Sequence, residues 1–338
     1  HEFDGWDTEY VRATTNVLDS DSATTALGEA AAECVKRTNA LREAICGIGH
    51  APTELILTRQ CADVSKLIYH MRINGDRLDP SILSTFDGGL RVAVESTLGG
   101  ELPDTSWWQA TCGVKHAGLG LRTTQSTALA AFVASRIASR PLVRTMVEQY
   151  AAATGASADN IMVAYDRRSE DALVTLVSTL PPESGGKLIE ELDVHASECA
   201  LAWTAIIEGD EDPADVSGQA SAARARPGAS ITPRDGEGDV EHPTGAQHGR
   251  GQRIQHVITS YCDEGLREGL RQHYATAGDG VAIRRLGELT DPDVDHSWLW
   301  HVSKHHGPVL ADDEFVEAVR VRLGAAGPTE PVPCARCG

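Results

Sequence analysis

The chain has 338 residues, a formal net charge of -19 and 41% hydrophobic residues. A chain of this length can bury cores for two domains, and its negative charge would repel nucleic acid and anionic membranes from most of its surface. Aromatic residues make up only 5% of the sequence, while alanine is abundant. This composition favours helices packed through small side chains over a β-sandwich.

The cysteine pattern indicates a reducing compartment. Eight cysteines stand at irregular positions, which does not suggest a disulfide framework. No signal peptide opens the chain, and no apolar run approaches the ~20 residues needed to cross a bilayer. We therefore expect an intracellular protein of the cytoplasm or nucleus, without a membrane span and with its oligomeric state open. Because the chain starts at His1 and stops just after a cysteine pair, we also expect a fragment of a longer reading frame.

The first third of the chain has apolar residues at helical spacing. The pattern predicts helices at about 22–47, 52–73 and 79–98, each bounded by glycine, asparagine or proline. The connections between them are short, which is typical of antiparallel packing. We expect residues 1–105 to form a helical bundle.

A distinctive stretch, WWQATCGVKHAGLGLR, occupies residues 107–122. Its two tryptophans ought to be buried, and its glycines allow positive φ in a tight turn. The Gly118-Leu119-Gly120 triplet lacks the preceding strand and the third glycine of a dinucleotide fingerprint. The stretch therefore predicts a buried corner between helices.

Positive charge gathers around and after this corner. No Asp or Glu occurs from Thr105 to Val147. The basic residues there are the candidate nucleic-acid contacts, Lys115, Arg122, Arg136, Arg140 and Arg144.

The last three arginines recur every four residues, so a continuous helix would place them on one face, although Pro141 is expected to break or kink it. One interpretation is that the row follows a nucleic-acid backbone by charge alone. The other is a solvated helix face paired with carboxylates.

Three segments in a fixed order resemble a known family: Gln109-Ala110-Thr111, then residues 117–122 (AGLGLR), then residues 128–135 (ALAAFVAS). They are similar to the region downstream of the polymerase palm in reverse transcriptases of non-LTR (LINE-like) retrotransposons, especially divergent protist copies. The family pattern reads approximately Gln-Ala-x-Leu-Pro, Gly-Gly-Leu-Gly-Leu-Arg and an alanine-rich helix ending Ala-Ser. Here Cys112-Gly113 replaces Leu-Pro, and Ala117 replaces the first paired glycine. The resemblance implies a region that runs from the thumb, which the bundle of residues 1–105 would form, through a connection to a Cys-rich knuckle.

The remaining sequence completes a mainly α fold class. We expect a helical domain with the basic segment at 106–207 and a flexible or disordered linker at 208–251, where glycine, proline and small polar residues dominate. Residues 252–338 are expected to form a C-terminal helical region that ends in half of a Cys-rich knuckle. It would include a small α+β piece, because the tryptophans two apart in Trp298-Leu299-Trp300 suit a short half-buried strand or an extended segment.

The chain ends in Cys334-Ala335-Arg336-Cys337-Gly338, a spacing that supplies half of a tetrahedral zinc site. Zinc held by Cys334 and Cys337 is thus a candidate cofactor. Its further ligands remain open: one alternative is an internal histidine, His301, His305 or His306. The resemblance implies instead that they lie beyond Gly338, and it extends to Arg322-Leu323-Gly324.

Two acidic or mixed clusters receive no catalytic role. Asp312-Asp313-Glu314 precede a predicted helix, where acids stabilise the N-terminus. His195, Glu198 and Cys199 lie on an apolar helix, where a single Cys and a single His are typical of core residues.

Polymerisation needs metal-binding carboxylates, and no such cluster is recognisable here. The resemblance therefore implies a non-catalytic fragment of an RNA-directed DNA polymerase polyprotein that helps to hold template and primer nucleic acid. The alternative is an acidic helical protein-interaction scaffold, which the charge of -19 favours.

Overall fold

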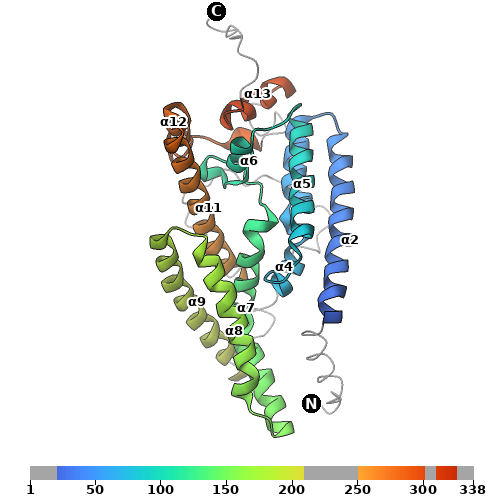
Figure 1. Ribbon diagram of the computed structural model, residues 1–338, viewed down its shortest axis with the longest axis vertical. Coiled ribbons are helices and arrows are strands. Elements are labelled where there is room, and N and C mark those ends of the chain that lie inside the picture. The colour runs from blue at the N-terminus through green and yellow to red at the C-terminus, as the bar shows by residue number, and fades with distance from the viewer. Residues whose placement is uncertain (1–20, 209–249, 301–309, 326–338) are drawn as a thin grey trace, which may run out of the picture.

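A computed structural model describes residues 21–208, 250–300 and 310–325, and no strand occurs among them. The mainly α prediction is confirmed (Figure 1). The helices and 3-10 turns are α2 (Asp21–Cys46), α3 (Ala51–Cys61), η1 (Val64–Lys66), α4 (Ile68–Asn74), α5 (Pro80–Thr97), α6 (Asp104–Thr111), η2 (Val114–His116), α7 (Thr124–Thr154), α8 (Ala158–Ser178), α9 (Pro182–Glu208), α11 (Arg250–Thr276), α12 (Gly280–Leu289), η4 (Ser297–Leu299) and α13 (Asp312–Arg322). None of these helices is both long and apolar enough to cross a membrane.

The longest helix, α7, spans 31 residues and forms the centre of the fold. It packs against α4, α5, α8, α9 and α11 (Figure 1). The predicted break at Pro141 is wrong, because the helix runs through it. A proline inside a helix costs about 3 kcal/mol. Contacts with α8 hold α7 on both sides of the proline, through Arg136 and Arg140 before it and Arg144 after it.

The helix predicted at 52–73, by contrast, is interrupted by η1 between α3 and α4. A buried arginine from α2 stabilises the interruption. The Arg42 side chain is 1% exposed, and its Nε donates a hydrogen bond of 2.8 Å to the Ala62 carbonyl. Its Nη1 donates to the Phe86 carbonyl at 2.7 Å. Arg42 thus donates hydrogen bonds to carbonyl oxygens outside its own helix. A local sequence pattern around residues 52–73 does not reveal this donor, because Arg42 lies in another helix.

The predicted strand around Trp298 is wrong, since Ser297–Leu299 form the 3-10 turn η4. Asp295 stabilises this turn: its carboxylate accepts from the Ser297 amide and the Ser297 hydroxyl, both at 2.8 Å. Such local capping favours a turn over an extended strand. The described C-terminal residues are therefore helical, without the expected β component.

Two hydrophobic cores cross the expected domain boundaries. One joins α3, α5 and α6 to the corner, η4 and α13, and contains Leu55, Leu90, Leu119, Leu299 and Phe315 among others. Another joins α7, α8 and α9 to α11. Residues on both sides of position 105, and on both sides of the expected linker, thus share buried surface. Of that linker, residues 209–249 lie outside the described part of the chain.

Candidate nucleic-acid interface and its supporting corner

The corner between α6 and α7 is organised around the Gln109 side chain, which is 0% exposed. Its Nε2 donates hydrogen bonds to the Ala117 carbonyl at 3.0 Å and to the Arg322 carbonyl at 2.8 Å. Its Oε1 accepts one from Arg285 Nη2 at 3.3 Å. The predicted buried corner is confirmed for Gln109, Ala117 and Leu119, but Trp107 and Trp108, which were expected to be buried, are only half-buried.

The corner backbone turns tightly at Ala117 and Gly118. Ala117 has φ 70°, the left-handed conformation that favours glycine. A Cβ on Gly118 would lie 2.0 Å from the Cys112 carbonyl oxygen, so a side chain has no room there. The two positions therefore differ in their demands: Ala117 occupies a glycine-like conformation, whereas Gly118 permits a close approach of two main-chain segments.

Arg322 binds α13 to this corner. Its side chain is 3% exposed, and burial lowers its pKa to about 10. Its Nε donates to the Gly118 carbonyl at 3.1 Å and its Nη2 to the Val114 carbonyl at 3.0 Å. The carbonyl groups of the corner and of α13 are thus bonded reciprocally, by Arg322 and Gln109.

Arg122, one of the five candidate contacts, forms an ion pair with Asp263 of α11. The side chains are 26% and 6% exposed, so most of this pair is inaccessible to a large ligand. Lys115 is exposed on η2. These two candidates flank the corner, and the row ending at Arg144 extends about 30 Å further along α7 at 1.5 Å per residue. The five predicted residues therefore do not form one compact surface.

The row on α7 faces α8, and each arginine has partners there. Arg136 donates to the Ser169 hydroxyl at 3.0 Å and the Tyr165 carbonyl at 2.7 Å, and burial lowers its pKa. Arg140 makes two hydrogen bonds of 2.8 Å to Asp166. Arg144 binds Glu148 at 2.8 Å and Asp159 at 3.2 Å.

The acids that pair with Arg140 and Arg144 lie after Val147, outside the acid-free stretch. This arrangement is the carboxylate-paired face that the sequence left as one of two interpretations.

A buried polar cluster lies where α2, α5 and α7 meet. Asp87 accepts from the Thr124 amide at 2.7 Å and the Gln125 amide at 3.3 Å, which caps α7. Asp63 is 5% exposed; burial raises its pKa to about 7, although the amides of Val64 and Arg122 oppose the shift. These acids hold the start of α7, and their role is structural.

No predicted metal ligand can be placed. Cys334 and Cys337 lie outside the described residues, as do His301, His305 and His306. Within the described ranges no group of three or more His, Cys, Asp or Glu side chains is arranged to hold a metal ion.

The two clusters to which the sequence analysis gave no catalytic role make contacts that stabilise the fold. Asp312 Oδ1 accepts from the Ala51 amide at 3.2 Å, and Glu314 accepts from the Ala311 amide at 3.0 Å. His195 contacts Glu198 at 3.2 Å, and Cys199 is buried in the core.

The structure also brings together basic residues that the sequence analysis did not combine. Arg168 of α8 binds Asp76 through two hydrogen bonds of 2.6 Å, linking α8 to the turn between α4 and α5. Next to this link a groove of about 820 Å³ is lined by Arg77 from the turn and Arg167 from α8. In the sequence, Arg167 lies among acidic residues, as on a charge-balanced helix face. Only the fold shows that it lines this groove.

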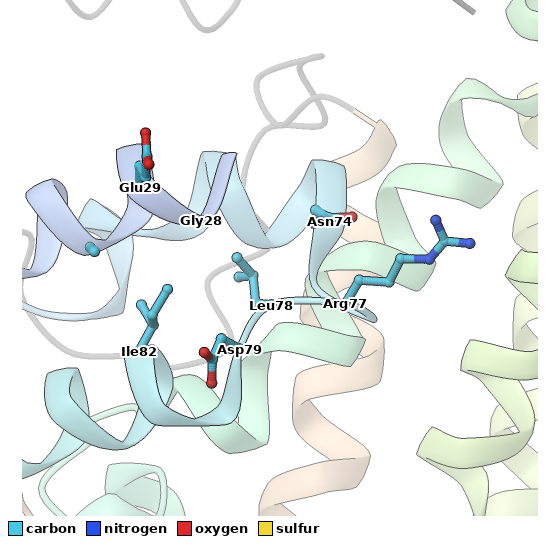
Figure 2. Close-up of a pocket in the computed structure, with 8 residues that line it drawn as sticks. Gly28, Glu29, Asn74, Arg77, Leu78, Asp79 and Ile82 are labelled. Atoms are coloured by element: carbon cyan, nitrogen blue, oxygen red, sulfur yellow. The ribbon is translucent and has the colours of Figure 1, made fainter. Parts of the chain in front are cut away.

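Arg77 also borders a second hollow, of about 400 Å³, between α2 and the same turn. Figure 2 shows Leu78 and Ile82 in this hollow, while the Arg77 guanidinium extends away from them. The apolar lining of the second hollow is Ala32, Leu78 and Ile82, near Gly28, and its charged side chains are Glu29, Asp79 and Arg77. The guanidinium of Arg77 is directed away from the apolar side of this hollow.

Comparison of the chain with protein-family profiles, characterised proteins and solved structures finds no match.

Proposed function

We propose that this chain is the part of a non-LTR retrotransposon reverse transcriptase that follows the polymerase palm, and that it contributes contacts to template and primer without catalysis of its own. One observation supports the proposal most directly. The two sequence blocks that resemble the family, around Gln109 and around Arg322, pack against each other through reciprocal hydrogen bonds. Two sequence blocks that bury their side chains against each other are expected to occur together in the members of one family.

In this proposal the chain works inside the cell, in the cytoplasm or nucleus, as a piece of a larger polyprotein. Zinc at Cys334 and Cys337 would stabilise a knuckle completed by further ligands. Thiolate ligands bind zinc with release of protons. Zinc content measured by mass spectrometry, in the chain and in a Cys334→Ser/Cys337→Ser variant, tests this part: equal zinc in both would contradict it.

RNA binding by the whole chain tests the main proposal. A protein that neutralises phosphates releases counterions, so its affinity falls linearly with salt on a logarithmic scale. We expect fluorescence anisotropy with a labelled single-stranded RNA to show binding that weakens steeply as salt rises. Incubation with a primed RNA template, magnesium and deoxynucleotides should yield no extended primer. Absence of RNA binding at low salt would reject the nucleic-acid role.

A second candidate, an acidic interaction scaffold, is favoured by the pairing of Arg140 and Arg144 with Asp166, Glu148 and Asp159. In these pairs the carboxylates neutralise the arginine charges that the sequence analysis had assigned to nucleic-acid contacts. If the chain fails to bind RNA but binds a partner protein of the same cell, the scaffold becomes the better explanation.

A further inference from the structure

The groove between α8 and the turn joining α4 to α5 offers a different location for phosphate contacts. Its lining includes Arg77 and Arg167, with Ser84 and Gln125 among its polar residues. Both arginines are exposed. Arg77 Nε lies 3.9 Å from Asp76 Oδ2, a longer contact than the 2.8 Å pairs of Arg140 and Arg144 on α7, and within the described ranges Arg167 has no hydrogen bond or ion pair.

The charge of the groove differs from that of the chain. Asp76 is largely neutralised by Arg168, which binds it with two hydrogen bonds of 2.6 Å. Asp171 is the other acid among the lining residues. Three arginines against two carboxylates leave the groove with a net positive charge in a chain of net charge -19. An anionic ligand would therefore be attracted here more than to the rest of the surface.

The shape of the groove suits one strand better than two. Its lining includes small apolar residues, Ala128, Ala164 and Ala172, beside Leu83 and Leu129. A volume of about 820 Å³ lies in the range of sites that enclose small organic ligands, which corresponds to nucleotides rather than to a duplex. A base or sugar can lie on these apolar residues while phosphates meet the guanidinium groups.

We infer that this groove binds a single strand of nucleic acid, with Arg77 and Arg167 contacting its phosphates from the turn and from α8. The inference rests on the proposed function. It moves the nucleic-acid contacts to the groove, whereas the sequence analysis assigned them to the row of Arg136, Arg140 and Arg144. It also gives Arg168 a supporting role: by binding Asp76 it removes a repulsive charge from the wall of the groove.

Two double variants of the full chain test the location. Arg77→Ala/Arg167→Ala removes the two exposed groove arginines and keeps Arg168, and Arg140→Ala/Arg144→Ala removes the same amount of charge from the α7 row. With a labelled single-stranded oligouridylate, we expect the groove variant to bind at least ~10-fold more weakly at low salt. Its salt slope should fall by about 0.7 for each phosphate that the protein no longer neutralises. The α7 variant should stay within about twofold of the unmodified chain, because its ion-paired arginines make no phosphate contact.

A third variant provides a gain of affinity that misfolding cannot mimic. Asp171 lies four residues after Arg167, on the same side of α8, so Asp171→Asn should tighten binding of the same probe. Circular dichroism melting of every variant checks that the fold is kept.

Binding by the unmodified chain that both double variants reduce equally would overturn the groove but leave the proposed function intact. No salt-dependent binding by the unmodified chain would overturn both.

Discussion

The Gln109 amide nitrogen donates a 2.8 Å hydrogen bond to the Arg322 carbonyl, 213 positions later in the chain. The return contact runs from Arg322 Nε to the Gly118 carbonyl, at 3.1 Å. Both side chains are almost completely buried, so water cannot replace either bond. The corner and α13 therefore depend on each other for the satisfaction of their main-chain groups.

Replacement of Gln109 by alanine should destabilise the chain strongly. The carbonyls of Ala117 and Arg322 would lose their donor inside the core, and a cavity would form, at a combined cost of about 3 kcal/mol. Urea unfolding followed by circular dichroism measures the change. Gln149→Ala, at an exposed position of α7, is the matched control and should change stability by less than about 0.5 kcal/mol. Equal midpoints for the two variants would contradict the proposed importance of this amide.

Substitutions at Ala117 and Gly118 should have very different effects. Gly118→Ala places a Cβ 2.0 Å from a main-chain oxygen, and we expect a loss of about 3 kcal/mol or more. Ala117→Gly removes the strain of an alanine in the left-handed conformation, which should stabilise the chain by about 1 kcal/mol. It also removes a buried methyl group, which should cost about 0.8 kcal/mol. The net effect should lie within about 1 kcal/mol of zero. Thermal melting of both variants checks the order, and a well-folded Gly118→Ala protein would show that the corner can relax.

Most helices could be predicted from the sequence because the helical spacing of their apolar residues is a local pattern. In α5, Leu83, Phe86, Leu90 and Val94 repeat at helical spacing, and all four are buried. The corner was also predictable, since its glycines permit the positive φ and close approach that a tight turn needs.

The features that escaped prediction depend on distant residues. Arg42 lies on the buried face of α2 because it bonds the Ala62 and Phe86 carbonyls, 20 and 44 positions away. The groove is a similar case, because Arg77 and Arg167 become neighbours only after α8 packs beside the turn after α4. A local pattern contains no information about either partnership, so sequence analysis found the corner but not the groove.

The three arginines of the α7 row should contribute unequally to stability. Arg136 is half-buried, makes two hydrogen bonds to α8, and lies with its guanidinium carbon 3.2 Å from the Tyr165 ring centroid. Its replacement by alanine should cost about 2–3 kcal/mol. Arg140 is 47% exposed in its ion pair, and exposed pairs contribute less than about 1 kcal/mol. Urea unfolding of Arg136→Ala and Arg140→Ala should therefore give clearly different midpoints, and equal losses would contradict the burial argument.

Asp63 should make the stability of the chain decrease as pH rises. Burial raises its pKa from 3.8 to about 7 in the folded chain. Between these values the folded state keeps a proton that the unfolded state releases, so stability is highest at low pH and is lost as pH approaches 7. The full shift corresponds to roughly 4 kcal/mol, at about 1.4 kcal/mol for each pH unit. Asp63→Asn keeps the shape and the acceptor for the Val64 and Arg122 amides but does not titrate.

Other carboxylates are common to the two proteins, so the difference between their unfolding free energies isolates Asp63. We expect the Asp63→Asn variant to match the unmodified chain at pH 4 and to become increasingly more stable than it up to about pH 7, measured by urea unfolding at a series of pH values. Arg42, Arg122 and Asp87 lie around this position in both proteins, and the Arg42 guanidinium, with a pKa of about 10, stays charged throughout this range. A constant difference from pH 4 to 8 would mean that Asp63 ionises in the folded chain at its ordinary pKa, with Arg42 and Arg122 compensating its burial completely.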